Sequence, residues 1–435
     1  MSTSPLAAEP LETAAPTRVG NVRWLICAML FAASTINYMD RQIIGLLKPT
    51  LMHDIGITEE TFGRIVAAFQ LAYTVGLVVT GRLIDRLGAR VGYSLVMAVW
   101  SAAGAAHALV GSAMGFGAAR VALGLGEGGN FPAAIKATTE WFPKRERSFA
   151  TGIFNAGTTT GAILAPFVVA WITKRYGWHA AFVTLGVLGA PWIVWWYSRY
   201  RTPDQDKAVT PAELAWIRSD QEESQERTEG LRWLDLLRYR RTWVLTAARS
   251  ITDPIWWFYL FWLPGFLNTR FHLSLQQQGV PLALIYLGSA VGGIGGGYLA
   301  SFLVRRGMTE LRARLTTMLI FACLSLPMLV ISHVTQLWLA VLLFSIVLGG
   351  HQGWSANMYT TVSDSFPARA VGSVTGISIM AGSLFGIALS LGIGRILQLT
   401  GSYTPMFILA GSVYLIAWLN LRFFGEGLHR IQLRS

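Results

Sequence analysis

The sequence has little charge for its length. Asp, Glu, Lys and Arg make up only 13% of its 435 residues, whereas hydrophobic residues make up 53%. In a soluble protein about a quarter of the residues are charged. Apolar runs of about 20 residues, long enough to cross a bilayer, recur from one end of the chain to the other. The composition therefore excludes an ordinary soluble domain and predicts an all-α protein that crosses the membrane many times.

Cysteine and catalytic motifs are also scarce. The two cysteines, Cys27 and Cys323, lie far apart inside apolar runs, so we expect inert buried thiols rather than a disulfide or a metal site. Gly124-Leu125-Gly126 lacks the third glycine of a dinucleotide-binding fingerprint. The chain also has no nucleotide loop, zinc spacing or nucleophile elbow. The sequence thus predicts no enzyme activity, no metal and no organic cofactor.

Twelve apolar segments can be counted, six on either side of a polar segment. They lie at 23–45, 61–82, 91–111, 114–138, 147–172 and 178–198, and then at 243–267, 279–301, 312–332, 337–361, 370–396 and 404–424. We therefore expect an N-terminal half at 23–198, a linker at 199–242 and a C-terminal half at 243–424. Residues 1–22 and 425–435 are expected to be tails, and the first lacks the basic-then-apolar order of a signal peptide.

The net charge of +12 could indicate a nucleic-acid partner, but its distribution argues against one. If the N-terminus is inside, most Lys and Arg residues fall in inner loops, and nine of them lie between Arg199 and Arg241. Only a few, such as Lys48 and Arg64, fall outside. This is the positive-inside pattern of membrane proteins, which predicts that both termini are cytoplasmic. The charge is then a sign of topology, and the expected partners are the bilayer and a small molecule.

The linker contains two signals for short helices. Thr210-Pro211-Ala212-Glu213 has the pattern of a capping box with proline at the first helical position. The segment 231–238 is amphipathic and is typical of a helix that lies at the membrane interface. Neither segment suggests chemistry, so we expect a brace between the two halves.

An internal repeat relates the two halves. Phe142-Pro143-Lys144-Arg145 recurs as Phe366-Pro367-Ala368-Arg369, at an offset of 224 residues. The same offset pairs 151–153 with 375–377, Gly126 with Gly350 and Gly129 with Gly353. An even number of spans between the copies makes this a parallel repeat, which places a substrate site between two pseudo-symmetric halves near the middle of the membrane. The alignment sets His351 opposite Glu127.

Four ionisable residues within the spans stand out: Asp40 and Arg41 in the first span, and Arg120 and Glu127 in the fourth. Charges inside a membrane are costly and usually mark a pathway for substrate or protons. Arg120 and Glu127 are seven residues apart and share a helix face. Two bases would attract an organic anion, and two carboxylates at different depths could carry a proton. The alternative is that these residues form ion pairs that only hold the two spans together.

The loop between the second and third spans, Gly81-Arg82-Leu83-Ile84-Asp85-Arg86-Leu87-Gly88-Ala89-Arg90, resembles the signature loop of the major facilitator superfamily. This resemblance implies a twelve-helix fold. Gly81 would allow two helices to approach closely, Asp85 would sit against the N-terminus of another helix, and Arg86 and Arg90 would anchor the inner face. We assign these four residues to gating. The second copy, near 297–307, has no aspartate.

A narrower resemblance rests on Asn37-Tyr38-Met39-Asp40-Arg41, Tyr73, Arg120-x6-Glu127 and the segment 210–214. These residues resemble the anion:cation symporter family. The sequences of residues 36–45 and 141–147 resemble its bacterial hexuronate transporters in particular. The resemblance implies that Asp40 and Glu127 couple protons, that Arg41 binds the substrate carboxylate, and that Arg120 is the partner of Glu127. Asn37, Tyr38 and Tyr73 are implied substrate contacts.

The remaining site predictions concern other spans. Arg249 matches an arginine of the glutamate-carrying relatives. It lies near the inner end, so a role at a gate or at the surface is expected as much as a substrate role. Asp253, which precedes a proline, is given no transport role. Some galactonate carriers have a glutamine in span five, where this chain has Asn155 followed by Thr158 and Thr159. The polar residues expected to face sugar hydroxyls, unless they serve as hydrogen bonds between helices, are His351, Gln352, Trp354, Asn357, Ser378 and Ser383.

The sequence as a whole predicts a monomeric secondary transporter in a bacterial inner membrane. It would import a hexuronate, such as galacturonate or glucuronate, together with protons, while the halves rock around the site. A different organic anion, namely an aldonate, an aldarate or an aromatic acid, is the main alternative. A membrane sensor that binds an anion without moving it is a remote alternative, because the inner segments contain no signalling domain.

Overall fold

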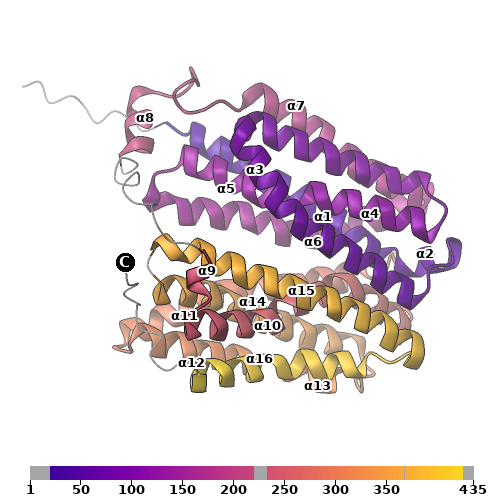
Figure 1. Ribbon diagram of the computed structural model, residues 1–435. Coiled ribbons are helices and arrows are strands. Elements are labelled where there is room, and N and C mark those ends of the chain that lie inside the picture. Colours follow the sequence, from indigo (N-terminus) through magenta and orange to yellow (C-terminus); the bar gives the residue numbers. More distant parts are fainter. Residues whose placement is uncertain (1–19, 220–232, 367, 425–435) are drawn as a thin grey trace, which may run out of the picture.

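The computed structural model describes residues 20–219, 233–366 and 368–424. In these residues all regular structure is helical. The long helices run roughly parallel in two bundles, which lie one above the other in Figure 1. We call the end that carries α2 the outer end and the end that carries α8 the inner end.

The first half of the chain contributes one bundle. Its helices are α1 (Val22–Leu46), α2 (Lys48–Asp54), α3 (Glu59–Ala106), the short 3-10 helix η1 (His107–Leu109), α4 (Ala113–Glu127), α5 (Asn130–Trp141), α6 (Lys144–Val187) and α7 (Gly189–Arg199).

The second half contributes the other bundle. Its helices are α10 (Arg240–Phe271), α11 (Gly279–Arg305), α12 (Glu310–Cys323), α13 (Met328–Ile331), α14 (Leu337–Ser365), α15 (Ala368–Thr400) and α16 (Thr404–Phe424).

Glycines in the left-handed region mark the turns of the bundle. Gly88 (φ 76°) divides α3 and Gly177 (φ 82°) divides α6, and only glycine adopts this conformation without strain. Gly307 and Gly401 have the same sign of φ at the ends of α11 and α15. Gly177 and Gly401 are 224 residues apart, which is the offset of the internal repeat. The repeat in the sequence is therefore also a repeat of backbone geometry.

The predicted twelve-span architecture is confirmed. Eight of the described helices or helix pairs are long and apolar enough to cross a membrane. Two of these eight, at 59–109 and 144–199, fold back at Gly88 and Gly177 and so supply two spans each. The spans formed by α4 with α5 and by α10 complete six in each half of the described chain.

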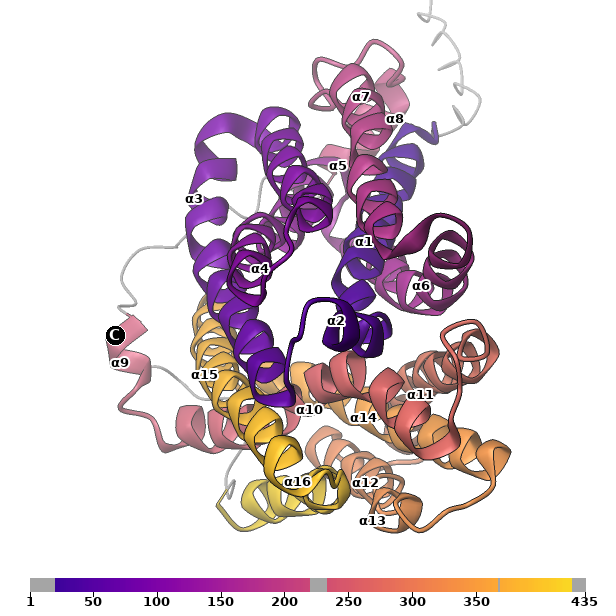
Figure 2. The ribbon, with the colours of Figure 1, turned by 90° about the vertical axis from the view of Figure 1, so that its right-hand side faces the viewer.

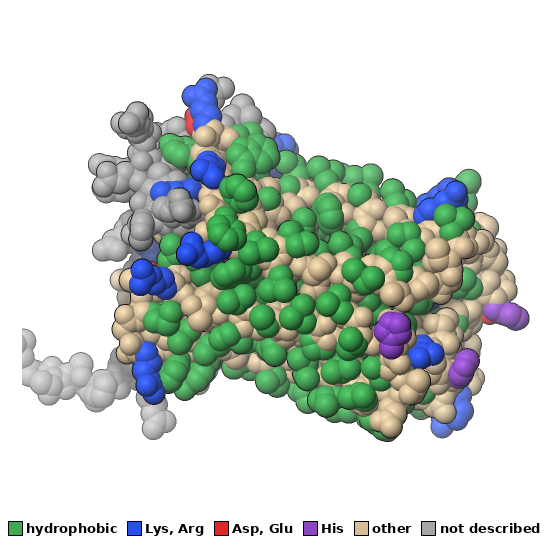
Figure 3. Space-filling model, turned by 90° about the horizontal axis from the view of Figure 1, so that it is seen from below, with side chains coloured by type: hydrophobic (Ala, Val, Ile, Leu, Met, Phe, Trp, Pro, Cys, Tyr) green, Lys and Arg blue, Asp and Glu red, His purple; other side chains and the backbone are tan. Residues whose placement is uncertain are grey.

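The surface agrees with a position in a bilayer. In Figure 3, which views the second half, hydrophobic side chains cover the middle of the molecule and Lys and Arg gather towards its two ends. Large apolar side chains such as Val291 and Ile294 are more than half exposed, at 64% and 77%. A broad exposed apolar band of this kind is expected where lipid, not water, surrounds the protein.

Three glycines allow α4 to enter the core of the first half. A Cβ atom placed on Gly124 would lie 2.7 Å from the carbonyl oxygen of Phe69, and one on Gly126 would lie 2.7 Å from the backbone nitrogen of Trp100. Phe69 and Trp100 belong to the two arms of α3, so α4 is wedged between them. Gly128 is equally tight. Small residues permit such close packing of helices in membranes, and here the packing sets Glu127 deep in the protein.

The linker docks one short helix on each half. In α8 (Pro211–Arg218) the Thr210 hydroxyl accepts a hydrogen bond from the backbone N–H of Glu213 at 3.2 Å, which confirms the predicted helix start. The buried Glu213 carboxylate accepts hydrogen bonds from Arg23 of the first half. The four-residue α9 (Trp233–Leu236) instead contacts α15 of the second half. The predicted brace between halves is therefore not what the described part of the linker forms, and 231–232 lie outside it.

Candidate functional site

A buried ion pair lies at the centre of the first half. The Arg41 Nε and Nη2 groups of α1 donate hydrogen bonds to Oε2 of Glu127, the last residue of α4, at 2.9 and 2.8 Å. Nη2 also donates to Oδ1 of Asn37 at 3.3 Å. Both charged side chains are almost fully buried. The sequence resemblance predicted that Glu127 pairs with Arg120, but in this structure the ion-pair partner of Glu127 is Arg41.

Aromatic rings surround the Arg41 guanidinium. Its carbon lies 4.9 Å from the ring centre of Tyr38 and 4.6 Å from that of Tyr73, both in the first half. A third ring, Trp257 of α10, lies 5.0 Å away and comes from the second half. Cation–π contacts of this kind stabilise a buried cation through the faces of the rings, while its N–H groups bind Glu127 and Asn37. The structure thus brings the predicted tyrosines together and adds Trp257, which sequence reasoning missed.

Asp40 and Arg120 lie beside this pair. Both are buried, and the charged groups that act on Asp40 are Glu127 and Arg120. Asp40 faces Trp100 and Gly104 of α3, whereas its neighbour Arg41 turns towards Glu127. The Arg120 guanidinium has no hydrogen-bond partner among the described residues. Neighbouring positions on a helix point about 100° apart, so the two adjacent charges serve different sides of α1.

The second half presents a pair of its own. Arg249 Nε donates to Oδ2 of Asp253 at 2.7 Å, and the guanidinium carbon lies 3.9 Å from the ring centre of Tyr359 on α14. The Arg249 side chain is 1% exposed, whereas Asp253 is 29% exposed. Tyr359 lies in the neighbourhood of Tyr38 and Tyr73 of the first half. Arg249 was expected at a gate, at the surface or at the substrate, and Asp253 was given no transport role. Because Arg249 is buried against Tyr359, the structure rules out the surface position.

The polar residues expected to face sugar hydroxyls mostly join helices within the second half. His351 is the residue that the repeat aligns with Glu127. Its Nδ1 forms a hydrogen bond with the Tyr414 hydroxyl at 2.6 Å, and its ring stacks on Trp256. Trp354 also packs on Tyr414. In the second half, the buried arginine and its acidic partner, Arg249 and Asp253, both lie on α10. Among the described residues His351 therefore has no arginine partner like that of Glu127, and it contacts Tyr414 of α16 instead.

The other predicted contacts are similar. Asn357 Nδ2 donates to the Gly296 carbonyl of α11 at 3.0 Å, and Ser378 is hydrogen-bonded to Thr246 at 3.0 Å. Gln352 and Ser383 are half-buried. The hydrogen bonds of Asn357 and Ser378 support the alternative of bonds between helices.

The three residues of α6 that were predicted to contact the substrate differ in burial. Thr158 donates to the carbonyl of Asn155 at 2.7 Å and is buried. Asn155 is exposed and Thr159 is half-buried. The Thr158 hydroxyl is thus already used within the helix, whereas Asn155 and Thr159 are less buried than Thr158.

The signature loop is built differently from the prediction. A Cβ atom on Gly81 would meet nothing closer than 3.9 Å, whereas one on Gly76 would lie 2.6 Å from the carbonyl oxygen of Leu125. The close approach of helices thus occurs at Gly76. Asp85 accepts from Lys136 of α5 at 3.3 Å and so forms an ion pair between helices.

The two arginines of the loop have different surroundings. Arg90 Nε donates to the Tyr197 carbonyl near the end of α7 at 2.9 Å. Arg86 is exposed. Arg90 thus anchors the inner end of the bundle, as predicted for a basic residue of this loop.

Residues 30–391 match the family described as Major Facilitator Superfamily. The chain belongs to the major facilitator superfamily. It is 30% identical to the hexuronate transporter of Escherichia coli (strain K12), over 90% of this chain and 91% of that protein. It is 31% identical to the galacturonate transporter of Dickeya chrysanthemi, over 65% of this chain and 82% of that protein. The probable galactarate/D-glucarate transporter of Bacillus subtilis (strain 168) is 28% identical, over 95% and 94%.

Solved structures agree on the fold. The crystal structure of the D-xylose-proton symporter matches with a TM-score of 0.72 and 14% identity, covering 92% of this chain and 97% of that one. A bacterial homologue of the human lysosomal transporter Spinster matches with a TM-score of 0.69 and 16% identity, covering 94% and 96%. Family and fold together identify a transporter of the superfamily and not an enzyme.

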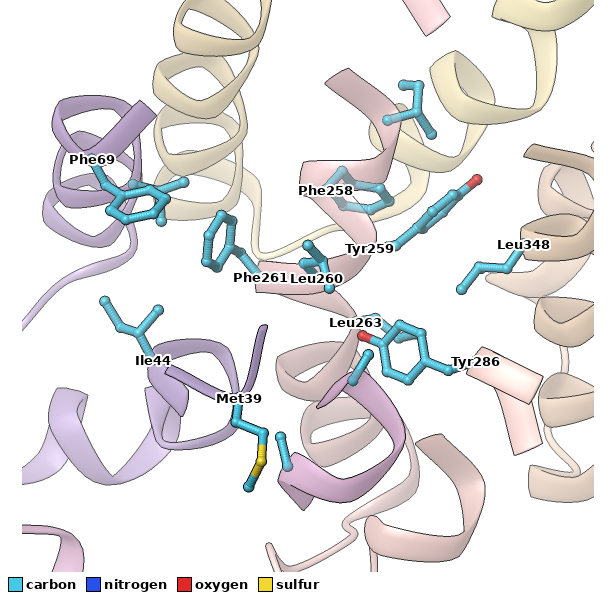
Figure 4. Close-up of a cluster of buried hydrophobic side chains, with 14 of the residues drawn as sticks. Met39, Ile44, Phe69, Phe258, Tyr259, Leu260, Phe261, Leu263, Tyr286 and Leu348 are labelled. Atoms are coloured by element: carbon cyan, nitrogen blue, oxygen red, sulfur yellow. The ribbon is translucent and has the colours of Figure 1, made fainter. Parts of the chain in front are cut away.

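At the outer end of this major facilitator, which faces the viewer in Figure 2, α1, α2 and α3 of the first half lie against α10 and α15 of the second along a seam. A Cβ atom on Gly63 would lie 2.6 Å from the carbonyl oxygen of Ser390, and one on Gly45 would lie 2.8 Å from that of Leu260. Figure 4 shows Ile44 and Phe69 of the first half facing Leu260 and Phe261 of the second. This dry packing closes the outer side of the site.

Polar contacts complete the seam at its outer rim. Lys48 of α2 is buried, pairs with Glu59 at 2.7 Å and reaches the Tyr403 hydroxyl of the second half at 3.4 Å. Glu60 pairs with Arg395 of α15 at 3.0 Å. The described structure is thus the conformation in which the outer ends of the halves are joined.

Proposed function

We propose that this chain is a secondary transporter that imports a hexuronate-type sugar acid together with protons by alternating access. The observation that carries the proposal is the buried Arg41–Glu127 pair in its ring of tyrosines and tryptophan. Relatives named as hexuronate and galacturonate transporters support the choice of substrate class. A bacterial inner membrane and cytoplasmic termini, as the charge pattern indicates, complete the proposal.

The pair suggests how proton and substrate are coupled. Arg41 is the base placed to bind the substrate carboxylate, but Glu127 occupies its hydrogen-bonding edge. A proton on Glu127 removes the negative charge and releases Arg41. Tyr38 and Tyr73 then offer hydroxyl groups to the sugar. Asp40 lies next to the pair and supplies the second carboxylate of the relay. Substrate binding and proton binding thus favour each other.

Uptake into proteoliposomes tests the proposal. Purified protein should accumulate labelled galacturonate or glucuronate when the outside is acidified, and a protonophore should abolish the accumulation. Galactonate should compete less well. Binding without uptake would support the sensor alternative. Uptake that does not depend on the pH gradient would show that transport is not coupled to protons.

A second candidate substrate class is the aldarates, which carry a carboxylate at each end. It is favoured by Arg249, whose Nη1 and Nη2 groups are buried without a hydrogen-bond partner among the described residues. Arg41 and Arg249 offer one base in each half, so a dicarboxylate could bind both. Competition of galactarate with galacturonate for uptake separates the two classes, because a dicarboxylate carrier would prefer galactarate.

A further inference from the structure

Four buried polar side chains form a cluster in the first half, next to the Arg41–Glu127 pair. They are Asp40 of α1, Trp100 of α3, His107 of η1 and Arg120 of α4, and none is more than 3% exposed. Each has an atom that finds no hydrogen-bond partner in the described part of the chain. These atoms are Asp40 Oδ2, His107 Nε2, all three nitrogens of the Arg120 guanidinium, and Trp100 Nε1, which lies towards the Asp40 carboxylate without the geometry of a hydrogen bond.

So many unpaired groups are not stable in a dry interior. A buried polar group that loses its partner costs ~1–3 kcal/mol, and a charged group costs more. Buried polar groups in proteins are almost always paired, if not with protein then with ordered water. Trp100 and Arg120 supply donors, whereas Asp40 and a ring nitrogen of His107 supply acceptors. Water molecules that bridge donors to acceptors would satisfy the whole cluster.

The position of His107 fixes which nitrogen is free. Its Nδ1 lies 2.8 Å from the carbonyl oxygen of Ala103 and 3.2 Å from that of Gly104, so Nδ1 carries the proton and donates. Phe182 stacks on the ring at 5.0 Å and Phe116 meets it edge-on at 4.8 Å. Nε2 is therefore left as an acceptor in the neutral ring.

The cluster connects the outer end of α3 with Asp40. Two residues beyond His107 the chain reaches Leu109, which is 86% exposed. On the other side of His107, a Cβ atom on Gly104 would lie 4.0 Å from Asp40 Oδ1. One helical turn thus separates His107 from the carboxylate. The seam between the halves is closed at this end, so a route inside the first half is the one that remains.

We propose that water occupies the space among these four side chains and that His107 relays protons between the outer face and Asp40. A proton from the outer water binds Nε2 and gives an imidazolium, while Nδ1 keeps its hydrogen bond to Ala103. The Nε2 proton then passes through the bridging water to Asp40 Oδ2, which leaves His107 neutral and Asp40 protonated. This inference rests on the proposed proton coupling.

The charges around His107 set the direction of the transfer. Arg120 on α4 is the charged group that acts on it directly, and Asp40 lies beyond Gly104 on α1. The arm of α6 that packs on the ring contributes Phe182. Burial and, after it, the positive charge of Arg120 both disfavour a lasting imidazolium. The proton therefore stays on His107 only briefly and moves on to the carboxylate.

Proteoliposomes test the relay. With His107→Leu, the initial rate of accumulation driven by a pH gradient should fall about a hundredfold, the lower end of what a positioned proton-transfer group contributes. Counterflow of labelled galacturonate, which needs no net proton movement, should stay within about twofold of the unaltered protein. His107→Gln, which keeps a polar group for water, should lose less accumulation than His107→Leu. The control is His333→Leu, an exposed histidine that should change neither assay.

Unchanged accumulation in His107→Leu, or an equal loss of accumulation and counterflow, would overturn the relay. Hydroxyl-radical footprinting of the unaltered protein tests the water independently of transport. Trp100 should be oxidised within milliseconds, whereas Trp196, equally buried but bonded to the Ala89 carbonyl, should not. An unmodified Trp100 would contradict the proposal, whatever the substrate proves to be. If the unaltered protein transports no sugar acid while Trp100 is oxidised, the proposed function fails and the water cluster stands.

Discussion

Replacing Glu127 by glutamine isolates the coupling step, because glutamine has the shape of a protonated glutamate. Both hydrogen bonds from Arg41 end on the same oxygen of Glu127, at 2.9 and 2.8 Å, in a site where both side chains are buried. Hydrogen bonds to charged groups contribute ~1.5–3 kcal/mol each, and breaking a buried pair costs about 3–5 kcal/mol. In the proposed mechanism, a substrate carboxylate has to displace this interaction in order to reach Arg41.

Glu127→Gln should therefore bind the anion more tightly at neutral pH. Release of only ~1.4 kcal/mol to the substrate raises the affinity about tenfold. In the unaltered protein the affinity should rise as the pH falls, because protonation frees Arg41. In the variant, which keeps only Asp40 of the two relay carboxylates, the affinity should change much less with pH. Exchange of labelled for unlabelled substrate should persist, but accumulation against a gradient should be lost.

Two measurements check this reasoning. Binding of galacturonate in nanodiscs, followed from pH 5 to pH 8, reports the affinity, and proteoliposome uptake reports the coupling. Glu310→Gln serves as control, since Glu310 is exposed at the start of α12. A variant that still accumulates substrate, or whose affinity follows pH like the unaltered protein, would refute the role of Glu127.

Three further perturbations test other parts of the structure. Arg249→Ala should weaken competition by galactarate about tenfold and competition by galacturonate much less, as expected for one lost charged contact; equal effects on both would argue against a second anion pole. Gly63→Val, whose Cβ would lie 2.6 Å from the Ser390 carbonyl, should prevent outer closure and abolish uptake, whereas Gly152→Val, in open space, should not. Asn357→Ala should lower thermal stability by ~0.6–1.7 kcal/mol without changing KM; a raised KM would restore Asn357 as a sugar contact.

The fold could be predicted from the sequence because it depends on hydropathy and repetition. Lipid requires long apolar segments with their backbone groups paired internally, so the spans are visible in composition alone. The site was predictable where charges interrupt those segments. Asp40, Arg41, Arg120 and Glu127 could hardly be placed in spans for packing alone, and the structure brings all four together.

The pairing of these charges was not predictable. Spacing within α4 put Arg120 and Glu127 on one face, but the break after Glu127 and the close packing of α4 on α3 turn the carboxylate towards α1. In the second half, the Arg249–Asp253 pair at a spacing of four residues was the available signal. It was overlooked because Pro254 suggested an interruption, whereas α10 continues through Pro254 and Pro264. Local sequence does not determine how a helix is rotated against its neighbours.

The positions of the two linker helices offer a distance that should change during the proposed transport cycle. Since α8 is fixed to the first half through Arg23 and α9 contacts α15 of the second, rocking of the halves must change the distance between them. Spin labels at Ala215 of α8 and Arg238 just after α9, both exposed, would record this distance from the inner end. While the outer seam is closed, the distance between the labels should be at its largest. Opening of the seam should shorten this distance. The cycle could thus be followed with the binding residues left intact.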